Sequence, residues 1–187
     1  MISSSRSRPW RSPELSAEGL QNERVRISVL SDTHSPRFWK RCPPAVGAAL
    51  QGVDLILHAG DVCLAETLEE LASYAPVRAV RGNNDGEEIA DWGAPERLET
   101  ELDGVSVAMV HDSGAAKGRG PRLRRWFPDA DLVVFGHSHI PWDEEYDGQR
   151  AFNPGSPTDK RRQPHGTMGE IVIEDGAIVS ARIFPVT

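Results

Sequence analysis

Side chains that can bind a metal ion occur along this chain in five short clusters. Their carboxylates, amides and imidazoles offer the oxygen and nitrogen donors that divalent metal ions bind in proteins. In chain order, the clusters are Asp32-Thr33-His34, Gly60-Asp61, Gly82-Asn83-Asn84-Asp85, His111 and Gly136-His137-Ser138-His139. A single pair such as Asp-x-His is a weak indication, because it arises often by chance. Five compatible clusters along one chain predict a metal centre.

Each cluster comes just after an apolar run of the kind that forms a buried strand. The runs span 25–30, 54–57, 77–80, 105–110 and 132–135. In open α/β sheets, functional sites lie at the carboxyl ends of the strands. Residues two apart at an extended strand end project to the same side, so Asp32 with His34, and His137 with His139, can each bind one ion together. We therefore expect the clusters to meet at one edge of a sheet.

The mixture of donor types narrows the choice of ion. Carboxylate, amide and imidazole donors together suit Mn²⁺, Fe²⁺, Zn²⁺ or Ni²⁺ better than they suit Mg²⁺, which prefers oxygen alone. The candidate ligands are Asp32, His34, Asp61, Asn83, His111, His137 and His139. They are too many for one tetrahedral zinc ion with an open position. They fit two ions that share a bridging carboxylate, at the separation of about 3.5 to 4 Å typical of two-metal hydrolytic sites.

The elements that must position these side chains change in kind along the chain. In the first half, three apolar runs alternate with helix-like stretches over 43–52 and 64–74, which is typical of parallel strands joined by crossover helices. In the second half, three Asp-Gly pairs lie between residues of strand type, and Asp-Gly is a strong signal for a two-residue hairpin. The pairs are Asp103-Gly104, Asp147-Gly148 and Asp175-Gly176, and one more helix is expected over 119–126. Together these patterns indicate an α/β fold with two packed sheets and helices outside.

Composition and charge limit the classes of function. The chain has 187 residues, with 28 acidic and 21 basic side chains and a net charge of -7, which argues against a surface shaped for nucleic acid. No segment is apolar for long enough to cross a bilayer. Cys42 and Cys63 have no metal-type spacing, so we interpret them as free thiols in a reducing, cytoplasmic compartment. Residues 1–24 are expected to form a flexible tail, and residues 25–187 a single domain.

The clusters occur in the order Asp-x-His, Gly-Asp, Gly-Asn-x-Asp, His and Gly-His-x-His, followed by Asn153-Pro154-Gly155-Ser156. This order resembles the calcineurin-like metallophosphoesterase superfamily, and the short length and Gly-Asn-x-Asp form look like its small YfcE-type phosphodiesterase branch. The resemblance covers about 25–183, and as an ordered set these motifs are highly specific. It implies a four-layer αββα sandwich of two packed mixed β-sheets flanked by helices, in agreement with the predicted elements.

The resemblance also implies a role for each candidate ligand. The first metal ion would be held by Asp32, His34 and His139, the second by Asn83, His111 and His137, and Asp61 would bridge them. The implied catalytic residues are Asp61, Asn83 and His111. In this pattern a metal-bound hydroxide attacks phosphorus in line, while both ions neutralise charge on the phosphoryl oxygens. Mn²⁺ is the expected ion, with Fe²⁺, Ni²⁺ and Zn²⁺ as alternatives.

Two positions depart from the pattern of the wider superfamily. Where relatives commonly have a histidine after the Gly-Asn pair, this chain has Asn84, which cannot deliver a proton at neutral pH. The YfcE-type branch generally lacks that histidine too, so the general acid is unassigned and substrates with good leaving groups are favoured. Asp112 follows His111 where relatives usually have glycine, and it could orient His111 or a metal-bound water, or cap the loop. Asp85 is a candidate hydrogen-bond partner of the region around Asn83.

Other polar residues have a structural interpretation. We expect His58 to be a satisfied structural histidine. Arg162 and His165 could reach a substrate phosphate, but a solvent-exposed loop is the preferred interpretation. The basic cluster 119–125 is interpreted as a solvated helix face, and the cluster 160–162 as a solvated loop closer to the proposed site.

The expected function is that of a binuclear-metal-dependent phosphoesterase, in particular a phosphodiesterase of small substrates. Neither a membrane nor a nucleic acid partner is indicated, and a homo-oligomer is compatible with the sequence. The main alternative is a non-catalytic protein-interaction scaffold, since the retromer subunit of similar fold serves as one with an eroded metal site. A phosphomonoesterase or a nuclease is a further alternative. A Ser-His-Asp hydrolase built on Ser113 or Ser138 would lack a Gly-x-Ser-x-Gly elbow and leave most of the donors unexplained.

Overall fold

The computed structural model describes residues 24–187, so the tail predicted over 1–24 lies, except for Arg24, outside the described residues. The strands are β1 (Val25–Leu30), β2 (Leu55–His58), β3 (Val77–Ala79), β4 (Arg97–Leu102), β5 (Val105–Val110), β6 (Leu132–Val134), β7 (Trp142–Tyr146), β8 (Gln149–Asn153), β9 (Thr167–Glu174) and β10 (Ala177–Pro185). The helices are α1 (Pro44–Ala49), α2 (Ala65–Ala72), α3 (Glu87–Trp92) and α4 (Arg119–Trp126).

None of the helices in this part of the chain is long and apolar enough to span a membrane. Cys42 and Cys63 are free thiols, as expected.

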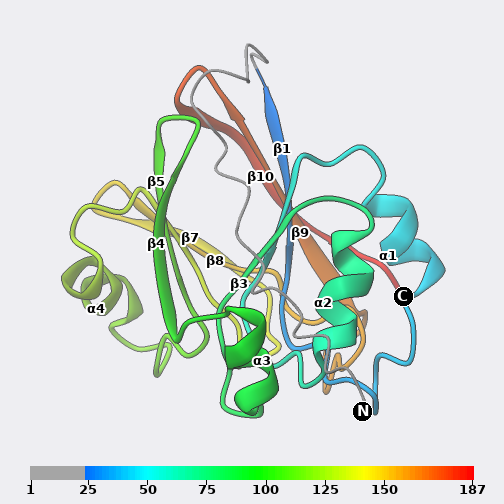
Figure 1. Ribbon diagram of the computed structural model, residues 1–187. Helices are drawn as coiled ribbons and strands as arrows, with labels where there is room; N and C mark the ends of the chain where they lie inside the picture. The colour runs from blue at the N-terminus through cyan, green and yellow to red at the C-terminus, as the bar shows by residue number, and fades with distance from the viewer. Residues whose placement is uncertain (1–23) are drawn as a thin grey trace, which may run out of the picture.

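Two mixed five-stranded sheets form the centre of the fold (Figure 1). The first sheet has the order β10-β9-β1-β2-β3, and its strands β1, β2 and β3 are parallel, as the alternation of strands and helices predicted. The second has the order β4-β5-β6-β8-β7, in which β5, β6 and β8 are parallel and the edge strands β4 and β7 are antiparallel to their neighbours. Parallel neighbours end at the same edge of a sheet, so the loops that follow them can meet there.

The two sheets pack face to face through an apolar layer. On β1, Ile27 and Val29 point into this layer, and on β5, Val107 and Met109 do so. The neighbouring Leu30 of β1 instead belongs to the apolar cluster on the helical side of the first sheet. This period of two is expected for strands whose two faces are both covered.

Helices cover the outer face of each sheet. On the first sheet, α1, α2 and α3 share one apolar cluster, in which α2 buries Leu68 and Leu71, as its leucine spacing predicted. On the second sheet, α4 packs through Leu123. The four-layer αββα sandwich expected from the sequence is therefore the observed fold (Figure 1).

Helix α3 was not expected from the apolar pattern, because Ile89 is its buried residue and the rest of the helix is more exposed. Its sequence signals lie at its ends. Glu87 and Glu88 in the first turn suit the positive end of the helix dipole. Gly93, with a φ of 111°, ends the helix in the left-handed conformation that favours glycine.

All three predicted Asp-Gly hairpins are present. Asp103-Gly104 joins β4 to β5, Asp147-Gly148 joins β7 to β8, and Asp175-Gly176 joins β9 to β10. Both residues of each pair have positive φ, between 47° and 79°. Two consecutive residues with positive φ are typical of the type I′ turn, whose twist matches that of the flanking strands.

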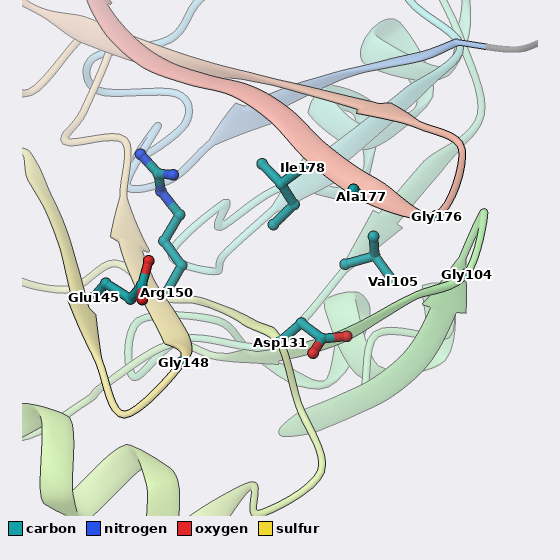
Figure 2. A pocket seen from close by; sticks show the side chains of 9 residues that line it. All are labelled: Gly104, Val105, Asp131, Glu145, Gly148, Arg150, Gly176, Ala177 and Ile178. Atoms are coloured by element: carbon teal, nitrogen blue, oxygen red, sulfur yellow. The ribbon is translucent and has the colours of Figure 1, made fainter.

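A cavity of about 410 Å³ lies where these three turns approach one another (Figure 2). The glycines of all three turns line it. The cavity lies at the amino end of β5, and six residues of extended strand, roughly 20 Å, separate this end from His111. Two of the charged lining residues are already engaged: Asp131 accepts the backbone amide of Ser106, and Arg150 makes two hydrogen bonds to Asp143. None of the candidate metal ligands lines this cavity.

Candidate metal centre

Two groups of three donors lie at the edge of the sandwich where the parallel strands end. The first group is Asp32, His34 and His139, and the second is Asp61, His111 and His137. Within each group, the ligand atoms all lie within 4.8 Å of one another. In both groups the aspartate follows a strand of the first sheet, and at least one histidine follows a strand of the second. The site therefore exists only because the two sheets are packed together.

The distances between donors are those of atoms that can share an ion. Atoms bound to one first-row metal ion lie roughly 3.0 to 3.4 Å apart, because their bonds to it are about 2.1 Å long. His139 Nε2 lies 3.3 Å from Asp32 Oδ1 and 3.2 Å from His34 Nε2. In the second group, His111 Nε2 lies 3.3 Å from Asp61 Oδ2.

Asp61 lies between the two groups. Its Oδ2 is 3.3 Å from His111 Nε2 in its own group and 3.7 Å from His34 Nε2 in the other. Asn83 is brought to the same place, because its Oδ1 lies 2.8 Å from His137 Nδ1. The structure thus gathers all seven side chains that the sequence singled out as candidate ligands.

Two of the histidines are oriented by hydrogen bonds on the side away from the site. His111 Nδ1 lies 2.7 Å from the carbonyl oxygen of Ala59, and His139 Nδ1 contacts the carbonyl oxygen of Asp159. A carbonyl oxygen only accepts, so each Nδ1 carries the hydrogen, and in the neutral ring each Nε2 would present a lone pair to the site. Metal-binding histidines are commonly held in this way.

Among the described residues, two buried atoms that face the site have no hydrogen-bond partner: Asp32 Oδ1 and His111 Nε2. The other carboxylate oxygen of Asp32 is satisfied, because it accepts hydrogen bonds from Ser31 Oγ at 2.7 Å and from the His137 amide at 3.0 Å. Burial raises the pKa of Asp32 to about 7. Buried acceptors without partners are destabilising, and a divalent cation would satisfy both atoms. The donor set therefore fits a metal ion.

The charges of Asp61 and His111 depend on each other. Burial acts to raise the pKa of Asp61, but the interaction with His111 and hydrogen bonds from Asn84 outweigh it and hold this pKa well below its usual range. Burial acts to lower the pKa of His111, yet Asp61 and Asp32 leave it raised. The lowered pKa of Asp61 and the raised pKa of His111 both reflect surroundings that favour positive charge between these carboxylates.

Left-handed turns, rather than extended strand ends, present most of the candidate ligands. Positive φ angles between 48° and 67° occur at Asp32, His34, Asp61, His137 and His139. The spacing argument therefore fails for His137 and His139, which lie in different groups, although Asp32 and His34 do share one. Side chains two apart need not point the same way outside an extended strand. Residues other than glycine keep this conformation only where surrounding contacts hold it.

Hydrogen bonds from the Gly82–Asp85 loop hold the central carboxylate in place. Asp85 accepts the backbone amides of Asp61 at 2.9 Å, Cys63 at 2.7 Å and Gly82 at 2.7 Å. Asn84 donates to both carboxylate oxygens of Asp61, from its backbone at 2.8 Å and from its side chain at 2.6 Å. Asn84, which the sequence marked only as a missing proton donor, therefore orients Asp61.

The Asn153-Pro154-Gly155-Ser156 motif forms hydrogen bonds to two loops that carry candidate ligands. Asn153 Nδ2 donates to the carbonyl oxygen of Gly136 at 2.8 Å, just before His137. Ser156 Oγ donates to the carbonyl oxygen of Asp32 at 2.8 Å. The motif therefore links the loop after β1 to the loop after β6.

Three polar residues weighed from the sequence lie outside the donor groups. His58 is fully buried, its Nε2 lies 3.2 Å from Thr33 Oγ1, and burial lowers its pKa to about 3, so it is the expected structural histidine. His165 is exposed, and its Nδ1 lies 3.0 Å from the carbonyl oxygen of Thr187. Arg162 is exposed as well, in agreement with the expected solvent-exposed loop.

Asp112 caps a loop, which is one of the two roles left open for it. Its Oδ1 accepts the backbone amide of Gly114 at 2.7 Å. Its Oδ2 lies 4.0 Å from His137 Nε2. Within the described part of the chain, no hydrogen bond joins Asp112 to His111, whose ring is held by Ala59 instead.

The basic helix α4 is not the solvated face that its composition suggested. Arg119 is buried and donates to Ser113 Oγ at 3.0 Å, and Arg122 donates to the carbonyl oxygen of Ser113 at 2.7 Å. Arg124 donates to backbone carbonyl oxygens as well. Of the described residues, no histidine forms a hydrogen bond with Ser113 or Ser138, so the Ser-His-Asp arrangement is not formed.

Comparison with known proteins agrees with this geometry. A model of the calcineurin-like phosphoesterase superfamily domain matches residues 25–176. The chain is 35% identical over 159 residues to a probable metallophosphoesterase of Methanothermobacter thermautotrophicus, covering 84% of this chain and 90% of that protein. Among solved structures, vacuolar protein sorting 29 of Cryptosporidium parvum gives a TM-score of 0.70 at 18% identity, covering 88% of this chain and 100% of the other. Vps29 of Entamoeba histolytica, solved in complex with Zn²⁺, gives a TM-score of 0.67 at 20% identity, covering 87% of this chain and 100% of the other. The chain belongs to the calcineurin-like phosphoesterase superfamily.

Proposed function

We propose that this protein is a binuclear-metal-dependent phosphoesterase that acts preferentially on phosphodiesters. The observation that carries the proposal is the position of Asp61, whose carboxylate lies between two groups of donors. Membership of the phosphoesterase superfamily supports the class of reaction. A cavity of about 440 Å³ beside the second group has a volume typical of small-molecule sites.

In the proposed assignment, Asp32, His34 and His139 would hold a first ion, Asn83, His111 and His137 would hold a second, and Asp61 would be shared by both. Bound there, two divalent ions supply positive charge that polarises a phosphoryl oxygen and activates water for in-line attack. The protein keeps Asp61 ionised, since its pKa is lowered, and Asn84 fixes the direction of both carboxylate oxygens. We propose Mn²⁺ as the ion, because mixed nitrogen and oxygen donors suit it.

The leaving group receives no proton from the Asn84 position, because an amide does not titrate near neutral pH. Asn84 is also occupied with Asp61 through two hydrogen bonds. We therefore propose that the preferred substrates have leaving groups that depart without general-acid help, such as phenolates.

The alternative is a non-catalytic protein-interaction scaffold of the same fold, a fold that this chain shares with vacuolar protein sorting 29. A scaffold has no need of buried metal-ligand atoms that lack a hydrogen-bond partner. In this chain, Asp32 Oδ1 and His111 Nε2 are buried without such a partner. The two free thiols suit a reducing, cytoplasmic location for either function.

The replacement Asp61→Asn tests the proposal. It keeps the size of the side chain but removes the bridging charge, so we expect hydrolysis of bis(4-nitrophenyl) phosphate with Mn²⁺ to fall by about 100-fold or more. Asp129→Asn is the matched control, because Asp129 is exposed and lies outside both donor groups. Full activity of Asp61→Asn, or purified wild-type protein that binds no transition metal, would contradict the proposal.

A further inference from the structure

Two arginines, Arg81 and Arg97, line the cavity beside the second donor group. His111 and His137 line it too, so the cavity of about 440 Å³ includes part of the candidate metal centre. Arg97 is the first residue of β4 and pairs across the sheet with Val110, the residue before His111. A molecule held at the two histidines therefore extends toward Arg97.

Arg97 is an exposed cation that stacks on aromatic rings and has no acidic partner among the described residues. Its guanidinium carbon lies 4.9 Å from the centre of the Trp126 ring and 5.7 Å from that of Phe127. Such stacking holds the guanidinium in place and leaves the N–H groups at its edge free to bind an anion. Within residues 24–187, no carboxylate forms an ion pair with Arg97.

The carboxylates that line the same cavity already have partners. Glu96 pairs with Arg81 at 3.2 Å, and Asp85 accepts three backbone amides. Asp112 accepts the amide of Gly114. The Nε atom of Arg81, in contrast, is buried without a hydrogen-bond partner among the described residues. Arg97 and the Nε atom of Arg81 therefore offer cationic N–H donors to a molecule in this cavity.

We infer that this cavity binds a second anionic group of the substrate. The preferred substrates are then small phosphodiesters in which one alcohol carries a further phosphate, with Arg97 as its main ligand and Arg81 beside it. The planar guanidinium matches two phosphate oxygens at once, which makes arginine well suited to this group. The inference rests on the proposed function, because it assumes that the diester itself lies at the metal centre.

Two esters with the same leaving group test the inference: thymidine 5′-(4-nitrophenyl phosphate) with and without a 3′-phosphate. We expect the wild-type protein to prefer the 3′-phosphorylated ester about tenfold in kcat/KM, mainly through KM, as one charge-assisted contact allows. Arg97→Met keeps the contact with Trp126 but removes the charge, so the ratio between the two esters falls toward one. Arg97→Lys retains part of the ratio. Arg125→Met, an exposed position outside the cavity lining, leaves the ratio unchanged.

Binding provides a second readout, by calorimetric titration with thymidine 3′,5′-bisphosphate and thymidine 5′-monophosphate. We expect the bisphosphate to bind about tenfold more tightly, and Arg97→Met to remove this difference. Equal kcat/KM for the two esters in the wild type, or a preference that survives Arg97→Met, overturns the inference and leaves the proposed function intact. If neither ester is hydrolysed, the proposed function fails, and the ratio of the two affinities still decides whether the cavity takes the second phosphate.

Discussion

At the residue scale, hydrogen bonds distinguish a buried histidine that is structural from one that can bind a metal ion. His58 and His111 are both buried. Both ring nitrogens of His58 have a partner, since Nδ1 accepts the Gly60 amide and Nε2 lies beside Thr33 Oγ1. His111 uses Nδ1 alone, on the carbonyl oxygen of Ala59, and leaves Nε2 facing Asp61. The free nitrogen of His111 is what makes it a candidate ligand.

Replacing His111 by alanine should remove one donor of the second group and none of the first. We expect the variant, loaded with Mn²⁺ and desalted, to keep about one ion per chain where the wild type keeps about two. Elemental analysis of the same samples measures this directly. His165→Ala is the matched control, because that histidine is exposed and bonds to Thr187. If His111→Ala retains both ions, the proposed ligand assignment is wrong.

At the scale of elements, the loop after β3 passes very close to the loop after β2. A Cβ atom added at Gly82 would overlap the backbone nitrogen and the carboxylate of Asp61. The backbone of Gly82 does not have a positive φ, so glycine is needed there for close approach rather than for conformation. The contact lets Asp85 and Asn84 reach the Asp61 loop with their hydrogen bonds.

Gly82→Ala should therefore displace Asp61 without touching any ligand atom directly. We expect kcat/KM to fall by about tenfold or more, with a lower Mn²⁺ content, because the bridging carboxylate moves. Gly86→Ala is the control in the same loop region, since a Cβ atom there would meet nothing within 4 Å. Circular dichroism of both variants establishes that they are folded. Wild-type activity of Gly82→Ala would show that the close approach has no role in positioning Asp61.

At the scale of the whole molecule, the candidate metal centre joins the two sheets. The loops after β1 and β2 supply Asp32, His34 and Asp61, and the loops after β5 and β6 supply the other histidines. The loops of the two sheets are also joined directly, since the His137 amide donates to Asp32 Oδ2 at 3.0 Å and His111 Nδ1 lies 2.7 Å from the carbonyl oxygen of Ala59. We propose on this basis that residues 25–187 act as a single domain.

Metal removal should accordingly weaken the folded state as a whole. A ligand present at about 100 times its dissociation constant stabilises the folded state by about 2.7 kcal/mol, so we expect chelation to lower Tm by roughly 5 to 10 °C. Differential scanning calorimetry with and without Mn²⁺ measures the shift, and adding Mn²⁺ back should restore it. Asp61→Asn should show a smaller shift than the wild type. An identical Tm in both conditions would mean that no ion binds the folded protein more tightly than the unfolded one.

The sequence by itself determined the donor types, most of the strands and the three hairpins. These features are local, since a strand needs only alternating apolar residues and a type I′ turn needs only its Asp-Gly pair. Helix α3 was missed because it buries little apolar surface, so its signals lay in Glu87, Glu88 and Gly93 rather than in the apolar period. The ordered motifs also identified the family, because their order is independent of how the chain folds in space.

The family resemblance implied which donors would share an ion, but only the tertiary structure decided how these donors come together and what surrounds them. His137 and His139 lie in different groups, and both have a positive φ that the pattern of apolar and polar residues did not predict. The role of Asn84 toward Asp61 likewise depends on two loops that meet after different strands. Arg97 reaches the cavity beside His111 because β4 pairs with β5. Each of these contacts joins residues distant in the sequence, and it is set by strand pairing and sheet packing rather than by neighbouring residues.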